Sequence, residues 1–99
     1  MSRKKDYGLK DQLQRAALSI SNNIAEGFEY NNNKDFIKYL RYAKGSTGEV
    51  RSMLNILLKL NLLPEDEFNN LYSKLIELSK QIKGFISYLM KYEKLKKEN

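Results

Sequence analysis

Apolar residues recur at steps of three and four along almost the whole chain of 99 residues, which is the spacing of one face of an α-helix. Two short polar segments divide this pattern into three stripes. The chain contains a single proline, Pro64, and five glycines, whereas a small β domain needs many more turn residues. The sequence therefore predicts an all-α protein built from three long helices.

The predicted helices span residues 9–28, 34–60 and 64–91, and a basic, frayed tail follows over residues 92–99. Asn33 is the predicted N-cap of the second helix, Asn61 its left-handed terminator, and Pro64 the first residue of the third helix. Because the two connections are only a few residues long, neighbouring helices must run antiparallel. We expect one domain, residues 1–99, folded as an antiparallel up-down-up helical bundle.

A chain of this length sustains a single core. The core is expected to form where the apolar stripes of the three helices meet. These stripes are Leu9, Leu13, Ala16, Ala17, Ile20, Ile24 and Phe28, then Phe36, Leu40, Ala43, Thr47, Val50, Leu54, Leu57 and Leu58, then Phe68, Leu71, Leu75, Leu78, Ile82, Phe85, Ile86 and Leu89.

The chain has no cysteine and no histidine. Disulfide frameworks, zinc fingers, thiol nucleophiles and histidine acid–base catalysis are therefore excluded, and no catalytic, cofactor or metal site is predicted. An enzyme would have to rely on Glu26 and Glu49, but di-metal sites in four-helix bundles draw Glu-x-x-His motifs from their helices. We expect these carboxylates instead to pair with Arg15, Arg41 or Arg51, or to bond backbone groups.

No segment approaches the roughly 18 unbroken apolar residues of a membrane span. The first residues contain no apolar run typical of a signal peptide. The absence of cysteine suits a reducing compartment. We expect a soluble, cytoplasmic protein without a membrane partner.

Most of the excess positive charge lies in the second predicted helix. The chain carries 18 Lys+Arg against 12 Asp+Glu, a net charge of +6, and residues 34–61 contribute +4 of it. On a helical wheel the cations lie opposite the apolar stripe, flanked by Tyr39 and Tyr42. One interpretation is a solvated helix face; the other is a surface for nucleic-acid phosphates with tyrosines as stacking groups. The candidate nucleic-acid-binding residues are Lys34, Lys38, Arg41, Lys44, Arg51 and Lys59.

Small residues interrupt this charged face. Gly45 and Gly48 lie on the same side of the predicted helix as Arg41, although glycine within a helix costs about 1 kcal/mol relative to alanine. Small residues let another helix backbone approach closely, so we expect a helix–helix contact here; a tolerated irregularity is the alternative. A second strip lies away from the apolar stripe of the first helix. The candidate helix-packing or oligomer-interface residues of the two strips are Gly45, Gly48, Ser52, Leu18, Ser21 and Ala25.

Two blocks of the chain resemble a known family. The run Arg15-Ala-Ala-Leu-Ser-Ile-Ser-Asn-Asn-Ile-Ala-Glu-Gly-Phe28 is similar to the signature Arg-Ala-x-x-Ser-Ile-Pro-x-Asn-Ile-Ala-Glu-Gly, and Phe36-x-x-Tyr-Leu-Arg-x-Ala-x-Gly-Ser-x-x-Glu49 is similar to its second block. They resemble the four-helix-bundle family of proteins encoded in intervening sequences of 23S ribosomal RNA genes, also labelled ribosomal-protein-like. The motif residues that match are Asn23, Glu26, Gly27, Arg41, Gly45, Ser46 and Glu49.

The resemblance implies a non-enzymatic bundle that assembles into a ring-like homo-oligomer, a pentamer, in which most motif residues serve packing and assembly. It also implies distant kinship with accessory proteins of diversity-generating retroelements, which bind nucleic acid and a reverse transcriptase. Two departures stand out. Ser21 replaces the usual proline, and only six residues precede Tyr7, where the family has a complete helix. The resemblance thus implies a bundle without its first helix, whose place we expect at the groove formed by Gly45, Gly48 and Ser52.

Two functions follow from these observations. The first is an oligomeric bundle that associates with RNA, favoured by the motif blocks and by the cations of the second helix. The alternative is a protein-interaction accessory subunit whose exposed groove binds a helix from a partner such as a reverse transcriptase.

Overall fold

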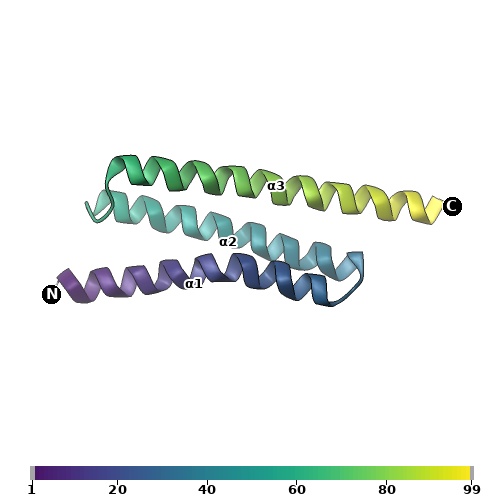
Figure 1. Cartoon of the computed structure of the whole chain (residues 1–99), viewed down its shortest axis with the longest axis horizontal. Helices are drawn as coiled ribbons and strands as arrows, with labels where there is room; N and C mark the ends of the chain where they lie inside the picture. Colours follow the sequence, from purple (N-terminus) through teal and green to yellow (C-terminus); the bar gives the residue numbers. More distant parts are fainter. Residues whose placement is uncertain (1, 99) are drawn as a thin grey trace.

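The computed structural model describes residues 2–98, and side chains over residues 8–98. Within these residues it contains three α-helices, α1 (Ser2–Glu29), α2 (Asn33–Lys59) and α3 (Glu65–Glu98), and no strand. α2 runs antiparallel to both α1 and α3 (Figure 1). The predicted all-α, up-down-up arrangement is confirmed.

Both outer helices are longer than their apolar stripes predict. α1 begins at Ser2 rather than Leu9, and α3 continues through Glu98. An apolar stripe marks only where a helix packs. Beyond the stripes, the lysines and arginine at the start of α1 and the lysines and glutamates at the end of α3 are good helix formers. The prediction that α3 ends near Lys91 in a frayed tail is therefore wrong.

The loop between α1 and α2 is fixed by asparagines. The N-cap of α2 is Asn32, one residue before the predicted Asn33, and its side-chain oxygen accepts a hydrogen bond from the backbone N–H of Asp35 at 2.9 Å. Asn31 precedes it in a left-handed conformation, with φ of 56°. Asparagine tolerates this backbone region better than most residues with a side chain. The tight turn therefore depends on two adjacent asparagines.

The loop between α2 and α3 follows the predicted chemistry more closely. Asn61 adopts a left-handed conformation with φ of 57°, which confirms it as the terminator of α2. Pro64 lies directly before Glu65, the first residue of α3, rather than within the helix as predicted. Its carbonyl accepts a hydrogen bond from the backbone N–H of Phe68 at 2.9 Å, so it still begins the helical hydrogen-bond pattern.

The three helices lie side by side in one layer with α2 in the middle (Figure 1). α1 and α3 each pack against α2, but their backbones do not approach one another within residues 2–98. The molecule measures 61 × 23 × 12 Å. Packed helices lie about 8–10 Å apart, so the width corresponds to three helices in a row rather than a triangle. The chain therefore forms an open layer with two broad faces.

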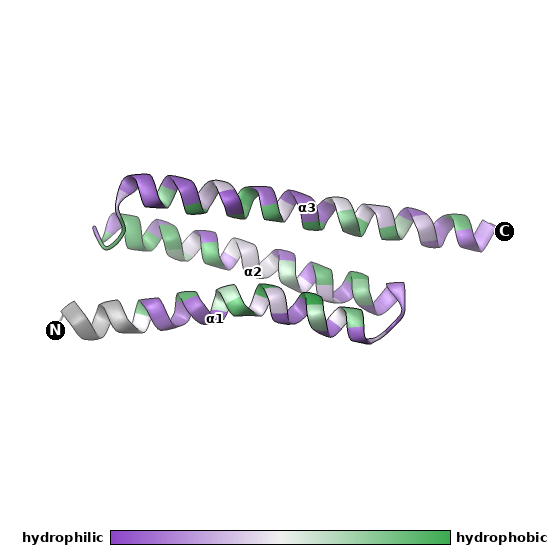
Figure 2. Cartoon of the chain, viewed as in Figure 1, coloured by the Kyte–Doolittle hydropathy of each residue, from purple (hydrophilic) through white to green (hydrophobic). Residues whose placement is uncertain are grey.

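The core runs along the middle of this layer, where α2 has a neighbour on each side. Figure 2 shows the hydrophobic residues of α1 and α3 concentrated on the sides toward α2. All the residues of the buried apolar cluster belong to the predicted stripes: Ala16, Ile20, Leu40, Ala43, Val50, Leu54, Ile82, Ile86 and Leu89. The buried hydroxyl of Thr47 donates a hydrogen bond to the carbonyl of Lys44 at 2.6 Å, so its burial leaves no unpaired donor.

Some residues of the predicted stripes are exposed instead. They are Ala17 and Phe28 in α1, and Leu71 and Phe85 in α3. Each outer helix has a single neighbour in the layer, so an apolar stripe wide enough for two neighbours is covered on one side only. The prediction that these residues lie in the core is wrong for the single chain.

Within residues 2–98, no helix combines the length and hydrophobicity needed to cross a membrane.

Candidate nucleic-acid interface

Two of the motif residues, Asn23 and Ser46, hold α1 against α2. The side-chain amide of Asn23 donates to the carbonyl and the hydroxyl of Ser19, at 2.8 and 3.0 Å. The Ser19 hydroxyl lies 2.9 Å from that of Ser46 on α2, which donates in turn to the carbonyl of Tyr42 at 3.1 Å. Each hydroxyl in this chain of hydrogen bonds can donate once and accept once, so the partly buried contact is satisfied. These groups have a structural role.

At Gly27, α1 lies very close to α2. A Cβ atom at this position would lie 2.7 Å from the Cβ of Tyr39 and 3.1 Å from Cδ1 of Phe36. No side chain fits there without displacing one of the helices. This motif glycine is therefore required by packing.

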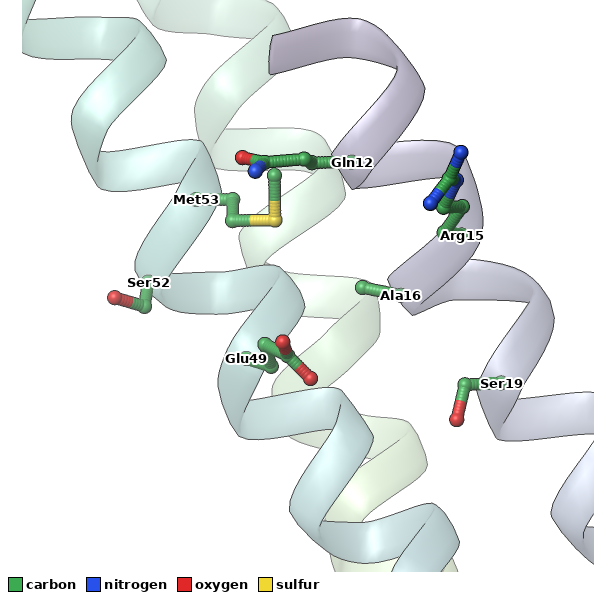
Figure 3. A pocket seen from close by; sticks show the side chains of 7 residues that line it. All are labelled: Gln12, Arg15, Ala16, Ser19, Glu49, Ser52 and Met53. Carbon is green, nitrogen blue, oxygen red and sulfur yellow. The ribbon is translucent and has the colours of Figure 1, made fainter. Parts of the chain in front are cut away.

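The motif carboxylates do not pair as predicted. Within the described side chains the salt bridge is that between Arg15 and Asp11, 3.2 Å apart on one turn of α1, and neither Glu26 nor Glu49 bonds an arginine or the backbone. Both glutamates are exposed, where solvation leaves little to gain from pairing. Figure 3 shows Glu49 on the α2 wall of a hollow opposite Arg15 on α1. No group of acidic residues in the described part of the chain could hold a metal ion.

A more strongly charged hollow of about 600 Å³ lies between α2 and α3. Its lining contains four cations and no carboxylate, with two glycines and a serine between them. The lining residues are Arg41, Lys44, Gly45, Gly48, Arg51, Lys83, Ile86 and Ser87. Because α3 adds Lys83 to the three cations of α2, the hollow carries more positive charge than the α2 stripe supplies alone.

A second hollow, of about 510 Å³, lies between the same two helices, nearer the C-terminal end of α3. It is lined by Lys34, Ile37, Met90, Glu93, Lys94 and Lys97. The residues of each helix that line the two hollows follow steps of three and four, so both hollows lie on one side of the α2–α3 contact. Nη2 of Arg41, which lines the first hollow, lies 3.4 Å from Sδ of Met90, which lines the second, so the two hollows adjoin. We call these two adjoining hollows together the basic seam.

The basic seam carries seven cations, which are Lys34, Arg41, Lys44, Arg51, Lys83, Lys94 and Lys97. Its single carboxylate, Glu93, accepts a hydrogen bond from the side-chain amide of Asn33 at 2.8 Å. The groove therefore has a strong excess of positive charge and favours anions along its length.

The structure brings four of the six sequence-predicted cations into the basic seam: Lys34, Arg41, Lys44 and Arg51. Lys38 turns toward Tyr39, with its Nζ 5.8 Å from the centre of the ring. Lys59 lies in the last turn of α2, where the helix dipole favours a cation.

Sequence reasoning missed the three lysines that α3 contributes. Lys83 lies in the third predicted helix, which is balanced in charge, and Lys94 and Lys97 lie in the basic tail, which was predicted to be frayed rather than helical. The signal is in the spacing, since Lys83, Ser87, Met90, Lys94 and Lys97 follow one another at steps of four and three and so share one stripe. A helical wheel of this segment would have shown the stripe, although Glu93 lies beside it and also lines the second hollow.

The predicted stacking residues form a separate tyrosine cluster beside the α1–α2 loop. The rings of Tyr30 and Tyr39 are stacked with centroids 5.3 Å apart, and Tyr42 meets Tyr39 edge-on at 5.5 Å. The hydrogen bond between the hydroxyls of Tyr30 and Tyr39, 3.3 Å long, together with desolvation, raises the pKa of Tyr39 to about 12. Tyr30 was not predicted, because its contact with Tyr39 requires the turn to be folded.

The predicted strips of small residues are exposed, except for Gly48, which is half-buried. A Cβ at Gly45 would meet nothing within 4 Å, and one at Gly48 would meet only the Arg51 guanidinium at 3.6 Å. The expected close helix contact is thus not made within the described chain. Leu18 is 59% exposed, and Ala25 and Ser52 are also exposed, while the Ser21 hydroxyl bonds the Leu18 carbonyl of its own helix. The two strips lie on different helices, and their role as an interface stays a prediction.

A family model described as 23S rRNA-intervening sequence protein matches residues 1–84. No curated protein and no solved structure matches the chain. The matched residues include both motif blocks, all of α1 and α2, and α3 as far as Gly84. The resemblance drawn from the motif blocks is therefore confirmed, and the chain belongs to the family of 23S rRNA-intervening sequence proteins.

Proposed function

We propose that this chain is a non-enzymatic protein that associates with RNA as a homo-oligomer and that binds the RNA phosphates at the basic seam. The observation that supports this proposal is the meeting of cations from α2 and α3 along one groove. Cations that neutralise phosphates release condensed counterions, and this provides affinity without recognition of sequence.

A merely solvated helix face does not account for this arrangement. Like charges on neighbouring positions repel one another, and acidic residues are available on α3 to balance them. Yet Glu65, Asp66, Glu67 and Glu77 lie outside the groove, and Glu93 is its single acid. An anionic ligand offsets the repulsion between the cations, which makes a polyanion the natural occupant.

The decisive experiment measures binding of labelled RNA by fluorescence anisotropy at several salt concentrations. We expect binding that weakens as salt rises, and a loss of at least tenfold in affinity with a shallower salt dependence for Lys44→Glu combined with Lys83→Glu. Lys10→Glu combined with Lys74→Glu is the matched control, because it changes the net charge equally at exposed sites outside the seam. Equal losses in both double variants, or no binding by the natural chain, would reject the seam as the RNA site.

The oligomeric part of the proposal is supported by exposed aromatic residues that lie outside the basic seam. An aromatic row crosses all three helices there: ring centroids of Phe28 and Phe36 lie 6.0 Å apart, those of Phe36 and Phe85 5.3 Å, and those of Phe85 and Tyr88 6.5 Å. Phe28 is 69% exposed and Tyr88 63%. Exposed apolar patches of this kind mark protein contacts, and a second copy of the chain is the proposed cover.

Light scattering of the purified chain tests this assembly. We expect a mass several times that of the 11.6 kDa chain, and the pentamer comes from the family resemblance alone. Phe28→Asp combined with Phe85→Asp should lower the mass toward the monomer, whereas Tyr42→Asp, at a site 50% exposed in the separate tyrosine cluster, should not. A monomeric natural chain would contradict the homo-oligomer.

The alternative function is an accessory subunit whose groove receives a helix from a partner such as a reverse transcriptase. The open space above Gly45 favours it, because a partner helix could approach the α2 backbone closely there. A chain that is monomeric and indifferent to RNA would favour this function. Gly45→Leu combined with Gly48→Leu should then abolish binding of the partner while the fold is retained.

A further inference from the structure

The lining of the basic seam is not cationic throughout, and we call the groups between its lysines the floor of the seam. Between the lysines lie Ile37, Met90 and the guanidinium of Arg41, which contacts the Met90 sulfur at 3.4 Å. Met90 is 49% exposed although it lies within a charged groove. A site that bound phosphates alone would gain nothing from exposed apolar atoms at its centre.

We propose that the basic seam binds an unpaired segment of RNA, with the phosphates on the rim cations and the bases against the floor of Ile37, Arg41 and Met90. This inference rests on the RNA association proposed above and specifies its ligand. Unpaired bases present an apolar face that can stack on a guanidinium plane and contact a thioether, whereas the bases of a duplex are already stacked and paired.

The dimensions of the seam favour a single strand. Along α2 it extends from Lys34 to Arg51, which is about 25 Å at the helical rise and is enough for roughly four nucleotides of an extended strand. Two packed helices lie about 8–10 Å apart, so the groove between them is narrower than a double helix. A duplex would reach only the rim cations and leave the floor uncovered.

The glycines of α2 widen the seam on one side. Gly45 and Gly48 both line it, and beyond the neighbouring residues and backbone of its own helix, no described atom lies within 4 Å of a Cβ built at Gly45. The wall is therefore low next to Arg41, so a base can reach the floor from the solvent side. The small residues that the sequence assigned to helix packing thus have a second use in this site.

The test compares an unstructured single strand of RNA with a duplex of the same sequence, at one low salt concentration, by anisotropy. We expect the single strand to bind at least tenfold more tightly than the duplex. Met90→Ala should weaken single-strand binding several-fold and leave duplex binding unchanged. Leu95→Ala is the matched control, since Leu95 is 53% exposed on the same helix but does not line the seam.

A second variant keeps the test independent of any effect of Met90→Ala on folding. Arg41→Lys retains the charge but removes the planar group, so it should weaken the single strand several-fold and the duplex little, whereas Arg51→Lys should affect both alike. Equal affinity for the two RNA forms, or equal effects of Met90→Ala and Leu95→Ala, overturns the inference and leaves the proposed function standing. Absence of binding to either form overturns both.

Discussion

The two contacts that α2 makes differ in how they are built. Toward α1 the contact is tight, closed by Gly27 and by the hydrogen bonds that link Asn23, Ser19 and Ser46. Toward α3 it is formed by larger side chains, and on one side it opens into the basic seam. Small residues and internal hydrogen bonds draw helices together, whereas long cationic side chains extend to solvent.

This difference explains how one helix serves both structure and recognition. Of the motif residues, Asn23, Gly27 and Ser46 belong to the tight contact, and Arg41 and Gly45 belong to the seam. We therefore expect substitutions at the first group to lower the free energy of unfolding, and substitutions at the second to change binding without lowering it.

The largest effect on stability is expected at Gly27. Gly27→Ala places a Cβ 2.7 Å from that of Tyr39, so α1 must shift, and we expect a loss of about 2 kcal/mol in the free energy of unfolding. Thermal unfolding followed by circular dichroism measures this as a lower midpoint. Gly84→Ala on α3, where a Cβ meets nothing within 4 Å, is the control and should not destabilise. Similar behaviour of the two variants would show that the contact toward α1 is not tight.

The hydrogen bonds across the same contact should have a smaller effect. Ser46→Ala removes a partner of the Ser19 hydroxyl and should cost about 1 kcal/mol. Ser19→Ala combined with Ser46→Ala should cost less than the sum of the single substitutions, because they share one interaction. Denaturant unfolding of the four proteins in this cycle gives the coupling energy, and strict additivity would contradict the hydrogen bond.

The opposite sign is expected at Gly45. Because its Cβ would enter open space, Gly45→Ala should raise the free energy of unfolding by somewhat less than about 1 kcal/mol through helix propensity alone. Glycine-to-alanine substitution is thus expected to destabilise the fold at Gly27, in the contact between α1 and α2, and to stabilise it at Gly45, on the side of α2 that lines the seam. Gly45→Ala could instead destabilise an oligomer of the chain, with an effect on stability that depends on protein concentration. That result would show that a partner copy occupies this space.

The smallest effect concerns the tyrosine cluster at the end of the tight contact. Tyr30→Phe removes the hydroxyl that is the main cause of the raised pKa of Tyr39, so this pKa should fall from about 12 toward its ordinary value of 10. Ultraviolet titration of tyrosinate measures the change, and Tyr92→Phe is the control because it does not contact Tyr39. In both proteins Tyr39 stays neutral at physiological pH, so no change in stability is expected there.

Much of the fold could be predicted because helix periodicity and turn chemistry are local. The positions of the buried cluster, the antiparallel order and the terminator at Asn61 all depend on residues within a few positions of one another. Helix ends were less well predicted, since Ser2 and Glu98 lie beyond the apolar stripes that defined the helices. The candidate site was predicted in part, because Lys34, Arg41, Lys44 and Arg51 follow one stripe of a single helix.

The sequence by itself determined that three amphipathic helices form, where they turn and which stripe of each is apolar. Tertiary structure alone decided that they lie in an open layer, that Lys83, Lys94 and Lys97 join the α2 cations, and that Gly27 is tightly packed while Gly45 faces open space. The physical reason is that such pairings depend on how each helix is rotated about its own axis. That rotation is set by the packing of all three helices together. The apolar stripe of one helix does not by itself determine which of its residues will face the neighbouring helix and which will face solvent.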